Sequence, residues 1–271
     1  MLIAQLTDLH IKQGGKQAYK KVDTLKCLYD AVNHINDLRP RPDCVVVTGD
    51  LGDFGVLEEY QLINKALAEF EMPLHVIPGN HDDRHNLRDG LSNLVSFDHP
   101  QYCNFVAEKD ELILVGLDSS VIGKPYGYLT TETLEWLDSV LTKNSTKPAM
   151  LFIHHPPMEV GLNHMDVQNL QNSDELYDVL KRYGNVTGIC TGHLHRPITA
   201  VWNSIPVWVG PSHSHSVTLD LDPNACSSFS LEPKAIQLLT VKGRTVVSHI
   251  SYIDDSDGPY PFFDEEGALI D

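Results

Sequence analysis

The sequence predicts an α/β fold, and three observations support this prediction. Short runs rich in Val, Ile and Leu recur along the chain, which is typical of strands buried on both faces of a sheet. The segments between these runs place apolar residues every three or four positions, as amphipathic helices do. Most of the runs end in Asp, Asn or His, and open α/β sheets bind ligands beyond the carboxyl ends of their strands.

Strands and helices are predicted to alternate over most of the chain, which favours a sheet covered by helices. The strands are expected at residues 2–6, 44–47, 74–77, 112–117, 150–153 and 186–190. The helices are expected at 22–38, at 57–70, after an N-cap at Thr130 or Thr131, and at 173–183.

The composition changes after about residue 199. Pro, Ser and Gly become more frequent, and the strand candidates are short, at 206–209, 236–241 and 246–253. We expect a catalytic domain over residues 1–217. We expect residues 218–271 to form a C-terminal extension that packs on the core or mediates assembly, since 271 residues suit one large domain with a small appendage.

The net charge of −17 limits the partners of this chain. A protein that binds long nucleic acid needs a basic surface to neutralise phosphates, so a nucleic-acid polymer is not an expected partner. Two divalent cations would offset only about four of these charges, and only locally. The charge therefore favours a small anionic substrate that reaches a metal pocket.

Other features indicate a cytoplasmic protein. No segment approaches the roughly 20 apolar residues of a membrane helix, so no membrane partner is expected. The amino terminus leads directly into the first strand, which is unlike a cleaved signal peptide. The five cysteines show no metal-binding spacing, and we expect reduced, mostly buried thiols.

The side chains at the strand ends are suitable ligands for two metal ions, because Zn, Mn, Fe and Co all accept carboxylate oxygen and imidazole nitrogen. Residues two apart at a strand end point the same way, and a carboxylate such as Asp50 can bridge two ions. One ion is assigned to Asp8, His10, Asp50 and His195, and the other to Asp50, Asn80, His154 and His193. Two such ions, roughly 3.5–4 Å apart, can acidify a water and neutralise a phosphoryl oxygen.

Five blocks in this order resemble the signature of the calcineurin-like binuclear metallophosphoesterases. The blocks are Asp8-x-His10, Gly49-Asp50-x-x-Asp53, Gly79-Asn80-His81-Asp82, His154-His155-Pro156-Pro157 and Gly192-His193-x-His195. Within that family the chain is most similar to class III cyclic-nucleotide phosphodiesterases and bacterial glycerophosphodiesterases. The resemblance implies a four-layer α/β/β/α sandwich, with two sheets flanked by helices and the metals at the carboxyl edge. It also implies a homo-oligomer, a dimer or larger, built partly through the C-terminal extension.

The resemblance also implies roles for single residues. The same seven residues carry over as metal ligands, with Asp50 shared between the ions. His81 carries over as a histidine beside the substrate that protonates or hydrogen-bonds the leaving oxygen. Protein phosphatases of the family have Asp-Arg-Gly where this chain has Asp53-Phe54-Gly55, which weakens a protein-phosphatase interpretation.

Several residues keep more than one interpretation. Asp53 either orients a ligand histidine or forms a turn. Asp82 either fixes the tautomer of His81 or caps the following turn. We expect Asp118 to support the site without binding metal. We expect His155 to point away from His154, as neighbours in a strand do, and to support the fold.

The later part of the chain supplies a candidate for substrate contact. His215 is the first choice, with His213 as the competing choice by spacing and a surface-loop histidine as the plain alternative. The loop at 164–166, which follows His154, is expected to act as a specificity lid.

The sequence therefore predicts a metal-dependent phosphodiesterase that acts on small phosphodiesters, with cyclic nucleotides such as cAMP and glycerophosphodiesters as the leading substrate classes. The expected reaction is attack of a metal-bound hydroxide on phosphorus, assisted by His81. A phosphomonoesterase of the same fold, acting on nucleotides or sugar phosphates, is the alternative enzyme. A non-catalytic scaffold is the alternative from another class, but it predicts gaps among the ligands, and every ligand position is filled.

Overall fold

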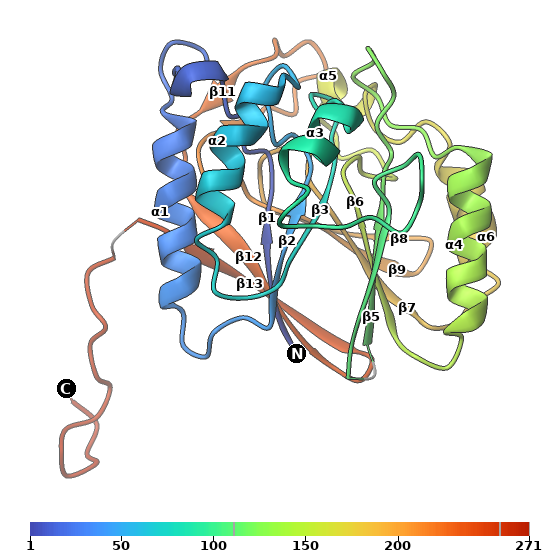
Figure 1. The fold of residues 1–271 in the computed structure, drawn as a ribbon. Coiled ribbons are helices and arrows are strands. Elements are labelled where there is room, and N and C mark those ends of the chain that lie inside the picture. The colour runs from blue at the N-terminus through green and yellow to red at the C-terminus, as the bar shows by residue number, and fades with distance from the viewer. Residues whose placement is uncertain (111, 255, 271) are drawn as a thin grey trace.

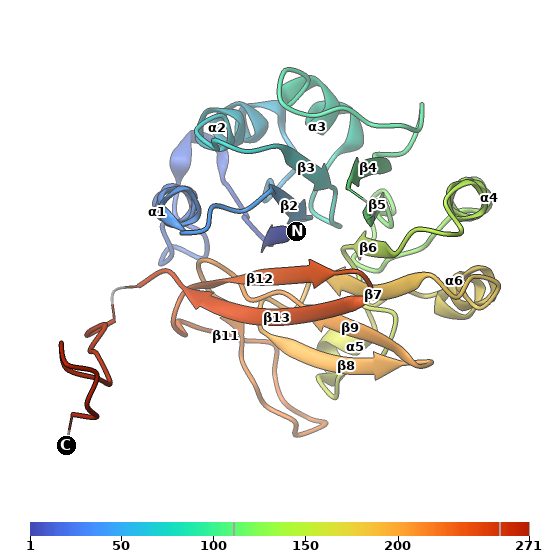
Figure 2. The ribbon, with the colours of Figure 1, turned by 90° about the horizontal axis from the view of Figure 1, so that it is seen from below.

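The computed structural model describes residues 1–110, 112–254 and 256–270. Two β-sheets pack against each other, and helices cover their outer faces, so the fold is the four-layer sandwich that was predicted (Figure 1). In the view from below, α1 and α2 lie on the side of the first sheet, and α4 and α6 lie on the side of the second sheet (Figure 2).

The first sheet has five strands in the order β13-β12-β1-β2-β3. Its strands are β1 (Leu2–Leu6), β2 (Cys44–Thr48), β3 (Leu74–Ile77), β12 (Ala235–Lys242) and β13 (Thr245–Tyr252). The strands β1, β2 and β3 are parallel, whereas β12 runs antiparallel to β1 with Leu2 opposite Thr240. The helices α1 (Thr24–Asp37) and α2 (Leu57–Leu67) cover the outer face.

The second sheet has six strands in the order β4-β5-β6-β7-β9-β8. Its strands are β4 (Phe105–Lys109), β5 (Leu112–Leu117), β6 (Ala149–Ile153), β7 (Val186–Thr191), β8 (Ile198–Trp202) and β9 (Ile205–Val209). The four inner strands are parallel, and the edge strands β4 and β8 are antiparallel to their neighbours. The helices α4 (Thr131–Lys143) and α6 (Ser173–Leu180) cover this sheet, and Thr130 caps α4.

Short elements surround the carboxyl edge of the sheets. They are the 3₁₀ turn η1 (Gln13–Gly15), α3 (Arg84–Gly90), α5 (Asn163–Asp166), β10 (Ser216–Val217) and β11 (Phe229–Ser230). The strands β10 and β11 form a small hairpin of their own.

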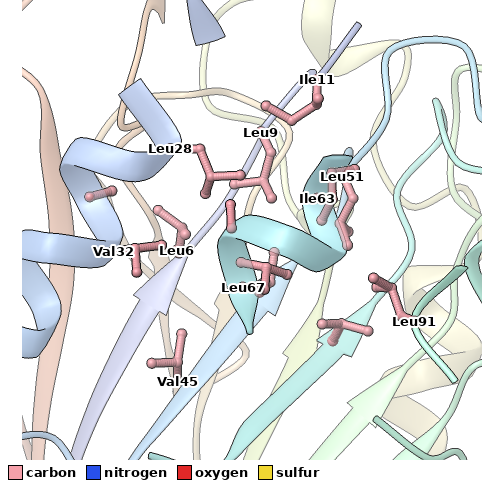
Figure 3. Close-up of a cluster of buried hydrophobic side chains, with 14 of the residues drawn as sticks. Leu6, Leu9, Ile11, Leu28, Val32, Val45, Leu51, Ile63, Leu67 and Leu91 are labelled. Atoms are coloured by element: carbon pink, nitrogen blue, oxygen red, sulfur yellow. The ribbon is translucent and has the colours of Figure 1, made fainter. Parts of the chain in front are cut away.

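Three apolar clusters stabilise the layers. One lies between the first sheet and its helices, where Leu6, Leu28 and Ile63 are fully buried (Figure 3). A second fills the space between the two sheets and includes Cys44 and Cys190, which are buried thiols as expected. The third packs α4 and α6 against the second sheet. Buried apolar area of this kind contributes about 25 cal/mol per Å².

The predicted strands lie within one or two residues of the observed ones. The four predicted helices are present, and the three whose bounds were predicted are shorter than expected. The sequence patterns missed the edge strands β4 and β8, because both strands are partly exposed and lack a continuous apolar run. Residues 235–252 form two strands of the first sheet, so this part of the predicted extension packs on the core. Beyond them, residues 256–270 leave the body of the molecule as an extended tail (Figures 1 and 2).

No helix in the described ranges is both long enough and apolar enough to cross a lipid bilayer.

Candidate metal centre

The strand ends of the two sheets open on one edge, and the predicted ligands meet there. Asp8 and His10 follow β1, Asp50 follows β2, and the histidine pair at 193 and 195 follows β7 of the other sheet. The loops after β1 and β2 are joined by backbone hydrogen bonds, since the His10 amide donates to the Asp50 carbonyl at 2.9 Å. Asn80 follows β3 and His154 follows β6, so the fold brings five separate sequence blocks to one place.

The backbone at this edge is strained. Five of the predicted ligands have φ values in the left-handed region, which residues with a β-carbon seldom adopt. These residues are Asp8, His10, Asp50, His193 and His195, with φ between 46° and 72°. Such conformations cost about 1–3 kcal/mol each and concentrate at functional sites.

Close approach also demands glycine beside the ligands. Gly49 has φ of 94°, and a β-carbon there would lie 2.3 Å from Nδ1 of His154. A β-carbon on Gly79 would lie 2.2 Å from Oδ1 of Asp50. The glycines of the Gly-Asp and Gly-Asn-His blocks are therefore required by packing against the ligands.

The first predicted ligand group is assembled. The ligand atoms of Asp8, His10, Asp50 and His195 all lie within 4.8 Å of one another, and the four side chains are buried. His10 Nε2 lies 3.1 Å from His195 Nε2 and 3.6 Å from Asp50 Oδ2. Two carboxylates and two imidazoles facing one point are a suitable donor set for a divalent transition-metal ion.

The second predicted group meets the first at Asp50. Its Oδ2 atom is 3.4 Å from His154 Nε2 and 3.6 Å from His10 Nε2, so this oxygen lies between the two groups. Asn80 Oδ1, His154 Nε2 and His193 Nε2 are buried and have no hydrogen-bond partner among the described residues. Buried polar atoms nearly always have hydrogen-bond partners, so these three unpaired atoms are suitable ligands for a second cation.

Charges at the centre favour a bound cation. Burial raises the pKa of Asp8 to about 6, although the charge of His154 opposes this. Burial alone would also raise the pKa of Asp50, but His154 and His81 outweigh it and hold that pKa well below its usual range. Burial would lower the pKa of His154, yet the carboxylates of Asp50 and Asp8 raise it to about 9. The two carboxylates thus attract positive charge to this point.

Burial disfavours the protonated form of the two histidines in the last block. Burial lowers the pKa of His193 to about 3 and that of His195 well below its usual value, and neighbouring histidines add to both shifts. A neutral imidazole is the form that binds a metal, so the direction of both pKa shifts favours metal binding.

Three of the predicted ligand histidines are oriented by hydrogen bonds at Nδ1, which leaves Nε2 to face the centre. His10 pairs with Asp53 Oδ1 at 3.2 Å, His154 with the Thr48 carbonyl at 2.7 Å, and His195 with the His215 carbonyl at 3.3 Å. Asp53 therefore contacts a ligand histidine, the first of its two interpretations. Lys12 lies 2.9 Å from the other oxygen of Asp53. Burial opposes ionisation of Asp53, but hydrogen bonds from His10 and Lys12 lower its pKa to about 2.

His81 lies beside the centre and lines the adjoining pocket. Its Nδ1 atom is 2.8 Å from the Asp53 carbonyl, and its amide donates to Asp50 Oδ1 at 2.9 Å. The backbone bond fixes the loop next to the shared carboxylate, and the side-chain bond fixes the ring. His81 is therefore held beside the pocket from two sides.

Asp82 has neither of the roles considered for it. Its carboxylate accepts from the amides of Gly79, Leu51 and Gly52 and from the hydroxyl of Tyr60, at 2.8–3.1 Å. It therefore joins the loop that carries Asp50 to the loop that carries Asn80. Tyr60, which is fully buried on α2, was missed from the sequence, because nothing in its local pattern indicates this partner.

Asp118 supports the site from the second sheet. Its carboxylate accepts hydrogen bonds from Nε and Nη2 of Arg84, with Nη2 at 3.1 Å from Oδ1. It also accepts hydrogen bonds from the backbone amides of Cys103 and Ser120. Arg84 begins α3, directly after the His81 loop. The prediction that Asp118 acts as a structural support agrees with these contacts.

The prediction for His155 was wrong. Its ring lies toward the centre, 4.9 Å from the His193 ring, and it forms a possible ligand cluster with His154 and His193. The reason is that β6 ends at Ile153, so the alternation of side chains along a strand no longer applies at 154 and 155. His155 Nδ1 lies 2.8 Å from the Ser119 hydroxyl, which also ties it to the second sheet.

A pocket of about 370 Å³ opens from the centre. Its described lining residues are His10, Tyr19, Asp50, Asn80, His81, Met165, Gln168, His193, His195, His215, Val217, Ser227, Ser228 and Phe229. His215 lines this pocket and is 3% exposed, so it is not a surface-loop histidine. His213 is fully buried and is not among these lining residues, which favours His215 for substrate contact. Met165 of the predicted lid also lines the pocket, whereas Tyr19 and Phe229 were not foreseen.

Two packed sheets with oxygen and nitrogen donors for a pair of cations at their carboxyl edge define a metal-dependent hydrolase. The chain belongs to the calcineurin-like phosphoesterase family, whose model matches residues 1–197.

Comparison with known proteins places this chain near two kinds of relatives. It is 44% identical to a probable glycerophosphodiester phosphodiesterase of Arcobacter nitrofigilis, over 100% of both chains. It is 30% identical to the 3′,5′-cyclic adenosine monophosphate phosphodiesterase of Escherichia coli K12, over 85% of this chain and 80% of the relative. The fold is similar to that of a dimetal phosphatase from Danio rerio, with a TM-score of 0.62 at 17% identity, over 92% of this chain and 98% of that one.

Proposed function

We propose that this chain is a metal-dependent phosphodiesterase that hydrolyses small phosphodiesters. The observation that supports this proposal best is that seven ligand candidates gather at one edge of the sheets, and five of them line one pocket together with His81. The names of the relatives agree with it, because they include glycerophosphodiester and cyclic-nucleotide phosphodiesterases. Both substrate classes remain candidates.

We assign the ligands as the sequence suggested. One cation binds Asp8, His10, Asp50 and His195, and the other binds Asp50, Asn80, His154 and His193. When bound, the two cations supply Lewis acidity and a nucleophilic water at neutral pH. Fe, Mn, Zn and Co all suit these mixed donors.

The chain itself positions the substrate and the leaving group. The Nδ1–H of His81 donates to the Asp53 carbonyl, so the ring presents Nε2 to the pocket. As an imidazolium, His81 gives the Nε2 proton to the leaving oxygen, which becomes a neutral alcohol. His215, which also lines the pocket and whose ring lies 5.8 Å from that of His10, contacts the substrate.

The charge of the chain is in accord with a small substrate. Among the described residues that line the pocket, none is Lys or Arg, so the pocket offers no ammonium or guanidinium group to bind a further phosphate group. The net charge of −17 would repel a polyanion. A single phosphodiester has no further phosphate group to bind, and it carries too little charge to be repelled strongly.

The deciding experiment uses chelator-stripped protein with Mn, Co, Zn or Fe(II) added back. Hydrolysis of bis(p-nitrophenyl) phosphate is compared with that of p-nitrophenyl phosphate. We expect metal-restored turnover that favours the diester. Preference for the monoester would support a phosphomonoesterase instead. Two bound ions without turnover of either ester would support the non-catalytic scaffold.

We also propose that the chain forms a homo-oligomer through its C-terminal extension, residues 218–271. The tail exposes large apolar side chains outside the body of the molecule, at Tyr260, Phe262, Phe263 and Leu269. Exposed apolar groups that gather in one segment are typical of contact surfaces. Mass photometry of the full chain and of a Phe262→Ser, Phe263→Ser variant tests this, and a monomer in both cases contradicts it.

The unpaired cysteines support a reducing environment, and we propose that the enzyme works in the cytoplasm. All five cysteines are free thiols, and Cys44, Cys103 and Cys190 are buried.

A further inference from the structure

A series of aromatic rings leads from the metal centre to the outer pocket. The ring of His215 lies 4.7 Å from His195 and 5.8 Å from His10. The same ring lies 5.3 Å from Tyr19 and 5.6 Å from Phe229, edge-on to both. Tyr19 and Phe229 stack on each other at 4.9 Å with 29° between their planes. This stacked pair lines the pocket within two ring contacts of a ligand histidine.

Tyr19 occupies a backbone conformation that suits a smaller residue. Tyr19 and Lys20 have φ of 51° and 57°, and they form the tip of a turn that the Lys21 amide closes onto the Ala18 carbonyl at 3.0 Å. Turns with positive φ at both central residues favour Asn and Gly. A bulky ring in such a place stores strain, and strain of this kind concentrates at functional sites. About half of the Tyr19 side chain, 51%, is exposed.

Phe229 is fixed from the metal side. It pairs with Val217 across the β10–β11 hairpin. Arg196, next to the ligand His195, donates to the Val217 carbonyl and forms a fork with Glu232 at 2.8 and 3.2 Å. Arg196 is only 8% exposed. The hairpin is therefore anchored to the same loop as the metal ligand, so the two rings have a defined position relative to the centre.

We propose that Tyr19 and Phe229 form a binding subsite for a heteroaromatic ring on one alcohol of the phosphodiester, as in a nucleoside. This inference rests on the proposed phosphodiesterase function. An aromatic face stacks on any base, and each such contact contributes roughly 5- to 100-fold in affinity. Gln168, Ser227 and Ser228 lie in the same pocket and offer hydrogen bonds to the edges of a base.

The test uses three diesters that release the same p-nitrophenol. Their retained alcohols are thymidine, which carries a base, choline, which carries a cation, and methanol, which carries neither group. The metal-loaded full chain is compared with Tyr19→Asn, which removes the ring and also relaxes the turn, because Asn accepts positive φ. Lys20→Asn is the matched control, since it relaxes the same turn without removing the ring. Tyr19→Phe keeps the ring and removes only the hydroxyl.

We expect the ratio of kcat/KM for the thymidine ester over the methyl ester to fall roughly 5- to 100-fold in Tyr19→Asn. The ratio should stay near that of the unchanged chain in Tyr19→Phe and Lys20→Asn. An equal loss on all three esters would overturn the subsite, because it would mean that Tyr19 supports the centre instead. A larger loss on the choline ester would overturn it in favour of a cationic alcohol.

A binding measurement separates this proposal from the proposed function. Calorimetry on the metal-loaded chain compares thymidine 5′-phosphate with methyl phosphate, and it requires no turnover. If all three esters are inert, the phosphodiesterase proposal fails, while the subsite still predicts tighter binding of the thymidine ligand. Loss of that preference in Tyr19→Asn supports the subsite, and no preference in the unchanged chain contradicts it.

Discussion

The two proposed cation positions share Asp50, but they differ in the charge of their other ligands and in the groups that orient those ligands. On the first side, His10 is held by the Asp53 carboxylate, which Lys12 in turn contacts. On the second side, Asn80 brings no charge, and the Nδ1 atom of His154 meets only a backbone carbonyl. The loop of Asn80 depends on Asp82, which accepts a hydrogen bond from the Gly79 amide. Both differences predict that the first position binds a cation more tightly than the second position does.

The largest effect is expected from His81, which lies beside both positions and is assigned to neither. His81→Ala should reduce kcat by roughly 10²- to 10⁴-fold, because it removes the proton donor to the leaving group. Elemental analysis should still find two ions per chain. If an ion is lost instead, His81 is a ligand and the assignment of the two positions is wrong.

A substitution at Asp53 should affect the first cation position alone. Asp53→Asn leaves a side chain of the same size but removes the charge that orients His10, so the first ion should bind roughly 10- to 100-fold more weakly. Calorimetric titration of metal-free chain with Mn measures both affinities. Asp37→Asn, on the end of α1, is the control. Equal weakening of both positions would show that Asp53 acts on the whole centre.

Asn80 tests the second side. The unchanged chain should show two classes of affinity, and Asn80→Asp should strengthen the weaker class by about tenfold, or about 1.4 kcal/mol, through the added charge. The same titration measures this. Two equal sites in the unchanged chain would contradict the asymmetry.

Tyr60 gives the smallest expected change at the centre. Tyr60→Phe removes a hydrogen bond to the buried Asp82 carboxylate, so the chain should lose about 1.5–3 kcal/mol of unfolding free energy. The second position should weaken by a few-fold, because the Asn80 loop is less well held. Tyr183→Phe, whose hydroxyl bonds Thr142 away from the centre, is the matched control. An equal effect on the first position would contradict this role for Asp82.

Much of the fold and most of the ligand set could be predicted from the sequence, because both depend on local patterns. A buried parallel strand is a continuous apolar run, and the residue after it lies at the carboxyl edge, as Asp8 and Asp50 do. The prediction for His155 failed because it extended the alternation of strand side chains past Ile153, where both the predicted and the observed strand end.

The remaining features depend on contacts between distant segments. Asp82 was visible in its block, but its partners on the Asp50 loop and on α2 were not. The stacking of Tyr19 on Phe229 joins a turn near the start of the chain to a hairpin near its end. Neither local pattern indicates the other, so only the folded chain shows the outer pocket.

The pairing of β12 with β1 has a consequence for synthesis. One edge of the first strand, which leads to Asp8, pairs with residues 235–242, with Leu2 opposite Thr240. This edge stays unpaired until those residues are available. Chains emerge from the ribosome amino terminus first, at about 5–20 residues per second. The strand made first therefore waits for one made near the end, and until then its open edge can pair with other chains. Contacts so far apart in sequence also slow folding. Expression at low temperature or with chaperones should therefore increase the yield of folded enzyme.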